Sequence, residues 1–346
     1  GYLAEKASTN LALQSEDFNT TWGVYQGTVA SNVAVAPDGT TTMDRFVVAA
    51  SYNQHMVYQS GITVGAATNY TYSAYMKNDG AGFAGITGSA SNVDFIAVVV
   101  DLSTGLVTDT NVGAAGGTIV ATGCEDAGNG IYRVWISGSV TGTSAAFYVF
   151  SSDAAVPPTW GNGRPVYTGV LGEDILVWGA QVELGTYPTS YIPTTTTAVT
   201  RNADVLIAGD MVTDAAGSGY AEASSIWATA DNTSYLLSTN SSGRLLAGNS
   251  GQADTSIIVY DGTTVATSPT GASFLNRPAP MASTWGDNLT AYKDGSGGTP
   301  KAYAGTMGTG SLNIGQRNTL GQQWNGTIRE VKIFDSELTA EEVGDL

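Results

Sequence analysis

Apolar and polar residues alternate along the chain in short runs, and this period of two is typical of half-buried β-strands. No window carries apolar residues at i, i+3, i+4 and i+7, the spacing of a long amphipathic helix. Most runs end at Gly, Asn, Asp or Pro, which are the residues that turns favour. The pattern predicts an all-β protein.

The first 190 residues contain a series of such runs with no helix between them. Strands are predicted at 44–49, 56–64, 70–77, 95–101, 117–122, 131–140, 146–151 and 175–183. A chain of short strands joined directly by turns predicts an antiparallel β-sandwich of the jelly-roll type.

The stretch WGAQVELGTYPTSYIPT (178–194) begins as a strand and ends in a run of Pro, Thr and Ser. Alternation along this strand predicts a core face of Leu176, Trp178, Ala180 and Val182. The opposite face ends in Gln181 and Glu183, which predicts either a polar surface that lines a ligand or a solvated outer face. The four threonines after Pro193 lack alternation, so they predict a linker or a strand crossover, with a domain boundary near residue 200.

The second half repeats the pattern, with strands predicted at 220–230, 234–238, 243–247, 255–260, 282–285, 289–293, 311–315 and 327–334. Asp294-Gly295 is a hairpin-turn signal, and Thr339 followed by Glu342 matches a capping box that predicts one short C-terminal helix. The length of 346 residues fits two cores. We therefore predict two β-sandwich domains in tandem, at 1–200 and 201–346.

Composition narrows the possible partners. With 13 basic and 30 acidic residues the net charge is −17, which repels a phosphate backbone and argues against nucleic-acid binding. No run of 18 apolar residues predicts membrane insertion, and the start at Gly1 predicts a chain processed or excised from a longer one. No cofactor is required, although Asp and Asn in loops would suit Ca²⁺.

The sequence contains few candidates for catalytic residues. Jelly-roll hydrolases need two carboxylates facing each other, often from alternate residues of one strand, and no such run occurs. A Ser-His-Asp mechanism would have to use His55, the single histidine. A lyase mechanism that uses Tyr58 would need His55 as well. Cys124 is the single cysteine, and its acidic neighbours predict a raised thiol pKa. We predict that the protein is not an enzyme.

Sugar binding needs exposed aromatic rings, because a pyranose packs on a ring while its hydroxyl groups seek amide, carboxylate or guanidinium partners. The candidate glycan-binding residues are Trp22, Tyr25, Tyr52, His55, Trp160, Asn162, Arg164, Arg317 and Trp324. Trp160 fits best, since it is predicted on a loop with little core to enter. Trp22 and Tyr25 fit a core-edge role as well, and the loop with Arg317 and Trp324 is either a sugar pocket or a hairpin tip.

Three stretches of the first domain carry a resemblance to a known family: GYLAEKASTNLALQSEDF (1–18), NGIYRVWISGSV (129–140) and ILVWGAQVELGTYPTSYIPTTTTAVTRNADV (175–205). They resemble the carbohydrate-binding-module-like jelly rolls of bacteriophage virion and tail-fibre proteins. In the second domain, NLTAYKDGS (288–296), LNIGQR (312–317) and WNGTIREVKIFDSELTAEEV (324–343) are similar to concanavalin A-like lectin domains of the laminin-G and pentraxin type.

These resemblances imply a non-enzymatic virion protein, as a head decoration, spike or tail fibre, that adheres to host-surface glycans. They imply a location on the virion surface, outside the cell. The expected partners are host polysaccharide and other virion subunits, and the expected state is a homo-oligomer such as a trimer. Two alternatives stay open: a purely structural virion subunit that binds no glycan, and the accessory binding region of a secreted polysaccharide-degrading enzyme.

Overall fold

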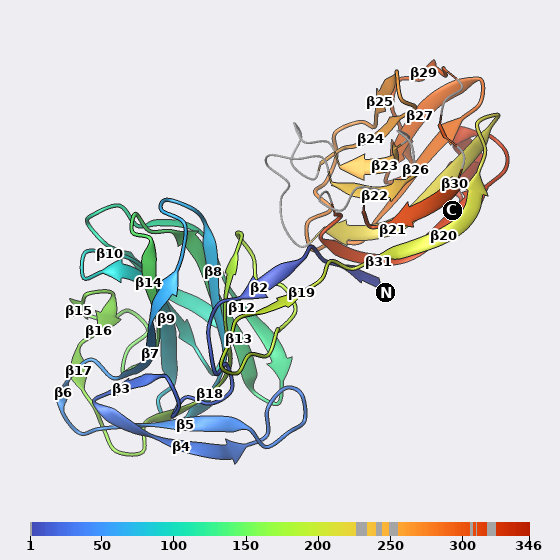
Figure 1. Ribbon diagram of the computed structural model, residues 1–346. Coiled ribbons are helices and arrows are strands. Elements are labelled where there is room, and N and C mark those ends of the chain that lie inside the picture. The colour runs from blue at the N-terminus through green and yellow to red at the C-terminus, as the bar shows by residue number, and fades with distance from the viewer. Residues whose placement is uncertain are drawn as a thin grey trace. The chain divides into compact units, whose positions relative to one another are not determined.

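The computed structural model describes residues 2–225, 234–239, 244–248, 255–304, 307–308, 310–316 and 323–346. The sheets in these ranges are antiparallel, with one short helix, so the all-β prediction is confirmed (Figure 1). The chain divides into two compact units. We call residues 8–201 the N-terminal module, and residues 1–7 with 202–346 the C-terminal module.

The N-terminal module is a sandwich of two six-stranded sheets. The front sheet has the order β11 (Leu106–Val112), β10 (Asp94–Asp101), β9 (Phe83–Ser91), β14 (Ser144–Ser152), β7 (Met56–Thr63) and β3 (Gly23–Tyr25). The back sheet has the order β12 (Thr118–Gly128), β13 (Ile131–Ser139), β8 (Tyr70–Asp79), β18 (Asp174–Leu184), β5 (Met43–Val48) and β4 (Gly27–Ala34). Side chains such as Phe46, Phe147 and Val177 fill the core between the two sheets.

Three two-stranded ribbons complete the N-terminal module: β15 (Trp160–Gly161) with β16 (Arg164–Pro165), β17 (Tyr167–Thr168) with β6 (Tyr52–Asn53), and β19 (Val199–Arg201) with β2 (Ser8–Asn10). Strand β9 was not predicted, because its sequence FAGITGSAS is too rich in small residues to show alternation. The small residues admit large neighbours. A Cβ at Gly88 would lie 2.4 Å from the Tyr72 ring, and one at Gly85 would lie 2.4 Å from Phe150.

Alternation along β18 breaks at Gly179. This residue has a φ of +62°, and the pairing with β8 shifts register between Trp178 and Gln181, as at a β-bulge. Four side chains of β18 enter the main core: Ile175 and Val177 before the bulge, and Ala180 and Val182 after it. The prediction that Leu176 and Trp178 share this core face is therefore wrong. They lie in a separate cluster on the outer face of the back sheet.

The segment after β18 does not leave the module at once. It folds back over the outer face of the back sheet, where the Tyr191 ring lies 4.5 Å from that of Trp178. Glu183 is fully buried there, and it accepts hydrogen bonds from the Thr189 backbone N–H (2.8 Å) and hydroxyl (2.7 Å) and from the Ser8 hydroxyl (2.5 Å). The polar end of β18 is thus neither solvated nor open to a ligand, because these contacts hold the returning segment.

The C-terminal module is a second two-sheet sandwich. One sheet has the order β1 (Tyr2–Ala4), β31 (Gly326–Phe334), β21 (Gly217–Ser225), β26 (Ala279–Trp285), β27 (Asn288–Lys293) and β28 (Ser296–Gly297), with β29 (Lys301–Ala302) also paired to β27. The other has the order β20 (Leu206–Val212), β30 (Gly310–Ile314), β22 (Tyr235–Ser238), β23 (Arg244–Gly248), β24 (Ile257–Tyr260) and β25 (Val265–Thr267).

Two local predictions for this module are confirmed. Asp294 and Gly295 have φ values of +50° and +75° and form the two-residue turn between β27 and β28. The helix α1 (Ala340–Gly344) begins after Thr339 with a complete capping box to Glu342. In the described part of the chain, no helix has the length and apolar character to cross a bilayer.

The first seven residues depart from the predicted division at residue 200. Strand β1 pairs with β31, and Ala4 is buried in the core of the C-terminal module. The Asp204 backbone N–H donates to the Glu5 carbonyl oxygen at 2.9 Å, so the segments that enter and leave this module are hydrogen-bonded to each other. Residues 1–7, predicted as the opening of the first domain, belong to the second.

Candidate functional site

The outer face of the front sheet carries a row of aromatic side chains. Directly paired residues of neighbouring strands project to the same face, and Tyr148 pairs with Tyr58, which in turn pairs with Gly23. Tyr25 lies two residues beyond Gly23 and therefore projects to this face from the edge strand β3. We call Tyr25, Tyr58, Tyr148 and Trp160 the aromatic face.

Tyr58 and Tyr148 form the centre of the aromatic face. Their ring centroids are 5.5 Å apart with an interplanar angle of 25°, and both side chains are half-buried. The Tyr58 ring lies across the edge strand because Gly23 has no side chain there, and a Cβ at Gly23 would lie 2.4 Å from Tyr58 Cζ. Both rings keep part of their surface exposed, and exposed ring surface is what a sugar contacts.

Trp160 reaches the same face through the β15–β16 hairpin. Its turn is Asn162-Gly163, with φ values of +53° and +82°, and the Thr87 hydroxyl of β9 donates to the Gly163 carbonyl oxygen at 2.6 Å. Trp160 packs edge-on against Phe150, with ring centroids 6.4 Å apart. The sequence predicted a loop here, although Asn-Gly between short strand residues is a hairpin signal.

Arg164 holds a positive charge within this row. Its side chain is buried, with the residue only 4% exposed, and Cζ lies 4.1 Å from the centroid of the Tyr148 ring. Its Nε donates to Gln54 Oε1 at 3.4 Å. Burial lowers the pKa of Arg164, and the interaction with Tyr148 opposes that shift. The Tyr148 ring is thus in contact with both the Tyr58 ring and the Arg164 guanidinium.

A polar hollow of about 160 Å³ adjoins Tyr148. It lies along the β14 residues that precede Tyr148, and β7 and β9 form its other walls. Hydroxyl and amide side chains dominate its lining: Ser60, Ser89, Ser91, Asn92 and Ser144. Aromatic rings beside several neutral hydrogen-bonding groups make an arrangement suited to a carbohydrate.

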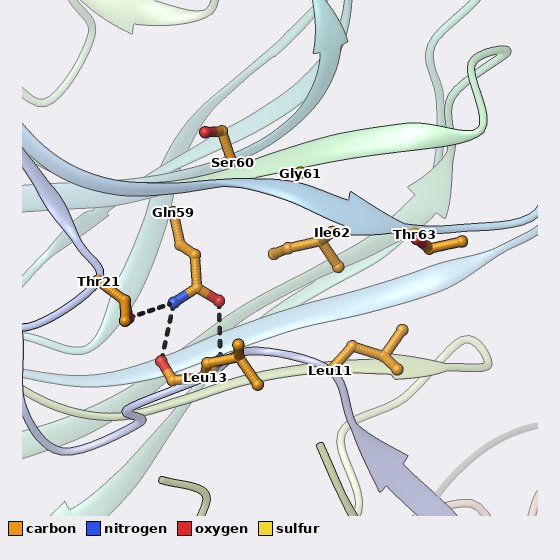
Figure 2. Close-up of a pocket in the computed structure, with 8 residues that line it drawn as sticks. All are labelled: Leu11, Leu13, Thr21, Gln59, Ser60, Gly61, Ile62 and Thr63. Carbon is orange, nitrogen blue, oxygen red and sulfur yellow. Dashed lines mark hydrogen bonds between the residues drawn. The ribbon is translucent and has the colours of Figure 1, made fainter. Parts of the chain in front are cut away.

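Figure 2 shows a second hollow, of about 290 Å³, beyond Ser60 and Gly61 of β7. Gln59 projects into it, but its amide is already used. Its Nε2 donates to the Leu13 carbonyl oxygen at 2.8 Å, and the Leu13 N–H donates to its Oε1 at 2.7 Å. Leu11, Leu13 and Ile62 supply the apolar lining. This hollow has no aromatic wall, so the first hollow is the better sugar site.

Two predicted site residues of the N-terminal module are buried. Trp22 lies in the main core and donates its Nε1–H to the Leu13 carbonyl oxygen at 3.0 Å, which is the core role left open for it. His55 is 0% exposed, with Nδ1 2.8 Å from the Gln26 carbonyl oxygen and Nε2 3.1 Å from that of Ser51. Neither ring can meet a ligand in this structure. Tyr52 is exposed, on the separate ribbon of β6 and β17.

In the C-terminal module, Trp324 is also withdrawn from solvent. It stacks on Phe274 with ring centroids 5.4 Å apart and donates Nε1–H to the Ser224 carbonyl oxygen at 3.0 Å. Its burial is that of a core residue and fits no sugar pocket. Arg317 lies outside the described residues. The structure therefore places four of the predicted residues, Tyr25, Trp160, Asn162 and Arg164, on one side of the N-terminal module. The sequence did not indicate Tyr58 or Tyr148 as glycan-binding residues, because only cross-strand pairing places them together.

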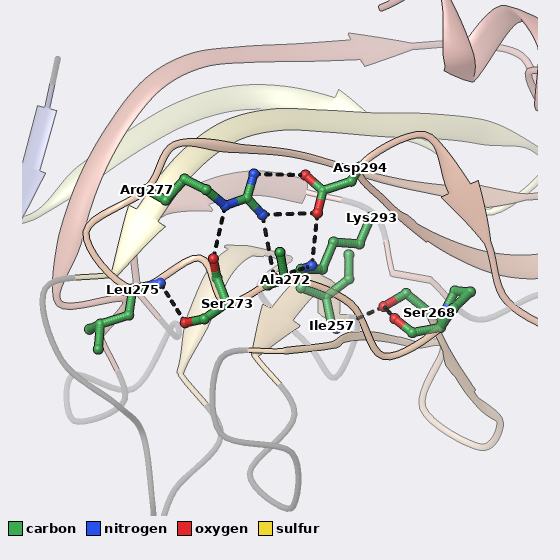
Figure 3. Close-up of polar contacts among 9 residues, drawn as sticks. Ile257, Ser268, Ala272, Ser273, Leu275, Arg277, Lys293 and Asp294 are labelled. Atoms are coloured by element: carbon green, nitrogen blue, oxygen red, sulfur yellow. Dashed lines mark hydrogen bonds and ion pairs between the residues drawn. The ribbon is translucent and has the colours of Figure 1, made fainter.

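Three charged residues of the C-terminal module, Arg277, Lys293 and Asp294, form a closed network and not an open site. In Figure 3, Arg277 holds both carboxylate oxygens of Asp294, at 3.1 and 2.9 Å. The buried Lys293 donates to Asp294 Oδ2 at 2.9 Å and to the Ala272 carbonyl oxygen at 2.6 Å. These partners satisfy one another, so the network reads as support for the β27–β28 turn.

Metal and thiol chemistry find little support among the described residues. No three His, Cys, Asp or Glu side chains there are grouped as metal ligands. Burial, with a further contribution from Glu125, raises the pKa of the Cys124 thiol to about 12, as its acidic neighbours predicted. Cys124 is therefore not a reactive thiolate at neutral pH.

Residues 211–344 match the family model Laminin_G_3, described as the concanavalin A-like lectin/glucanases superfamily. No curated protein matches the chain. Among solved structures, the chain is similar to domains LG4-5 of the mouse laminin alpha1 chain, at 11% identity and a TM-score of 0.26, covering 82% of this chain and 86% of that one. It is also similar to a putative carbohydrate binding protein from Bacteroides ovatus, at 11% identity and a TM-score of 0.32, covering 80% and 79%.

Proposed function

We propose that this protein binds glycans and that the aromatic face of the N-terminal module holds the sugar. The observation that carries the proposal is the half-open Tyr58–Tyr148 stack beside a hollow lined by hydroxyl and amide groups. A pyranose in this hollow would contact the exposed edge of the Tyr148 ring and place its hydroxyl groups toward Asn92 and Ser144. The lectin-type family match of residues 211–344 supports a carbohydrate role for the chain. We propose binding without catalysis, because the sequence offers no paired carboxylates and His55 is enclosed.

Affinity electrophoresis and calorimetry against soluble neutral and acidic polysaccharides test this function. We expect wild-type protein to bind at least one polymer, and Tyr148→Ala to bind it about tenfold more weakly, because stacking is worth about 1 kcal/mol. Leu171→Ala is the control, since Leu171 is an exposed apolar residue of the loop between β17 and β18. EDTA should leave the affinity unchanged, because the proposed site uses no metal. Failure to bind any polymer, or full affinity in Tyr148→Ala, would refute the proposal.

The setting we propose is the surface of a virion, outside the cell, with host polysaccharide as the ligand and other virion subunits as neighbours. The resemblance of 1–18, 129–140 and 175–205 to virion jelly rolls supports this setting. The identity of the genes beside this one tests the proposed setting. Capsid and tail genes beside this one would support the proposal, whereas genes for secreted polysaccharide-degrading enzymes would favour the accessory role.

One observation favours a structural role as a second candidate. Strand β20 is an edge strand of its sheet, and Leu206, Ile207 and Met211 are exposed along it. An exposed apolar edge is a surface on which another strand can pair. If self-assembly is the function, light scattering will show an oligomer whose mass falls in Ile207→Lys. A monomer at all concentrations would leave this role without support.

A further inference from the structure

The second hollow, of about 290 Å³, differs in character from the polar hollow that adjoins it. Its least exposed lining is apolar, because Ile62 is 5% exposed and Leu11 and Leu13 are half-buried. Figure 2 shows Ile62 on one side of the hollow and both leucines on the other. The hydroxyl groups of the lining belong to exposed residues: Thr21, Ser60 and Thr63. The second hollow therefore has an apolar interior and a polar rim.

Gln59 projects into the second hollow, but it has no N–H group left for a ligand. Its Nε2 donates to the Leu13 carbonyl oxygen at 2.8 Å and to the Thr21 hydroxyl oxygen at 3.2 Å, which uses both N–H groups of the amide. A sugar hydroxyl placed against the apolar interior would lose its water without gaining a partner. An apolar group therefore suits this hollow better than a hydroxyl-rich sugar ring does.

The two hollows share a wall, which Ser60 and Gly61 of β7 form. The pairing of β7 with β14 shifts register here, so that these two residues lie opposite Ala146 alone, as in a β-bulge. Gly61 has a φ of +78°, and a Cβ there would meet nothing within 4 Å. No neighbouring atom crowds the wall at this point, so one ligand can reach both hollows.

We propose that the ligand is an acylated glycan: its sugar ring occupies the polar hollow, and an acyl ester on that ring or the next one enters the second hollow. This inference rests on the proposed glycan binding and adds the substrate class. An acyl ester carries a short apolar chain at a sugar hydroxyl. It thus joins in one molecule the two kinds of surface that meet at the wall of Ser60 and Gly61.

Calorimetry with matched polymers tests the acyl group. Four neutral polymers, glucomannan, galactomannan, dextran and pullulan, are each prepared without esters, with acetyl esters, and with butyryl esters at the same degree of substitution. We expect wild-type protein to bind at least one acetylated polymer about fourfold more tightly than its ester-free form, the effect of one apolar carbon leaving water. The butyryl form of that polymer should bind at least about tenfold more tightly than the ester-free form, because more apolar carbons enter the hollow.

Leu13→Asn should remove the preference for esters, because it places an amide in the apolar interior of the second hollow. Leu171→Asn is the matched control. It makes the same substitution at an exposed apolar residue of the loop between β17 and β18, and it should keep the preference. Thr63→Trp is a second variant, at an exposed residue of the rim. Its larger side chain should occupy part of the hollow and remove the gain from butyryl over acetyl.

The outcomes separate the inference from the proposed function. Equal affinity for esterified and ester-free polymers, or a preference that persists in Leu13→Asn, would overturn acyl recognition while glycan binding stood. An equal loss of the preference in Leu171→Asn would assign it to general apolar attraction and would overturn the inference too. Binding of no polymer in any form would overturn both. If circular dichroism shows that Leu13→Asn is unfolded, Thr63→Trp and the wild-type comparison decide the matter.

Discussion

Gly179 determines which side chains of β18 reach the core. Its φ of +62° is open to glycine at little cost, whereas other residues pay about 1–2 kcal/mol to adopt it. The bulge it permits moves Trp178 to the outer face, where the ring meets Tyr191 of the returning segment. The alternation of residues 175–183 does not predict this switch in which side chains face the core. A single glycine within a strand is a known bulge signal, and it is the only local hint.

Replacing Gly179 with Ala should lower the free energy of unfolding of the N-terminal module by about 2 kcal/mol. Alanine at this position would have to adopt a left-handed backbone conformation, and its Cβ would lie 2.8 Å from Tyr75 Cδ2. Urea unfolding followed by tryptophan fluorescence measures the effect. Gly209→Ala is the control, because a Cβ there meets nothing within 4 Å. Equal stability of Gly179→Ala and wild type would show that the bulge does not need glycine.

At the scale of single elements, the β27–β28 turn combines an intrinsic signal with a charge network. Asp294 and Gly295 adopt the positive φ values of the turn, and Arg277 and Lys293 then hold the Asp294 carboxylate. Burial favours a higher pKa for Asp294, but the hydrogen bonds and charges of Arg277 and Lys293 outweigh it and lower the pKa. The network therefore stabilises the folded module when Asp294 is ionised.

Asp294→Asn tests this network, because Asn tolerates the same backbone conformation. At neutral pH we expect a loss of about 1–2 kcal/mol, small because Asp294 is partly exposed. A lowered folded pKa gives stability that is present above the unfolded pKa, about 3.9, and lost as pH falls through the folded pKa. The gap between variant and wild type should therefore close below about pH 4. A gap that stays constant from pH 7 to 3 would contradict the assignment, and thermal unfolding across this range measures it.

The elements that the sequence predicts best are those whose signals are local. Asp294-Gly295 and the Thr339 capping box need only their own neighbours, and both are confirmed. Strand β9 was missed because atoms of other strands leave no room for a side chain at Gly85 or Gly88: the Val98 carbonyl oxygen and Phe150 ring at Gly85, and the Tyr72 ring at Gly88. The aromatic face was found only in part for the same reason. Tyr58 and Tyr148 are 90 positions apart, and only the pairing of β7 with β14 places them together.

For the whole molecule, the main departure from the predicted tandem is the place of the first strand. The chain enters the C-terminal module at residues 1–7 and again at 202, so two segments join the modules. On the N-terminal side these segments are paired as β2 and β19, with Thr9 opposite Thr200. A prediction from sequence could not see this, because β1 has only three residues and its partner lies at the far end of the chain.

A variant that begins at residue 8 should have a less stable C-terminal module and an unchanged N-terminal one. It loses the pairing of β1 with β31 and the buried Ala4, an effect of about 2–4 kcal/mol. Differential scanning calorimetry should show one transition shifted downward. Ala4→Lys, which places a charge in the same core, should shift that same transition. Equal shifts of both transitions, or none, would show that β1 does not belong energetically to the C-terminal module.

The position of β1 has a consequence for how the protein is made. Tyr2 leaves the ribosome well before its partner Ile328, because the whole N-terminal module lies between them in the sequence. The N-terminal module can complete its fold while translation continues, since its strands all lie within residues 8–201. Residues 2–4 therefore stay without their strand partner throughout that interval, and the sheet that contains β1 is completed only after residues 326–328 have been synthesised.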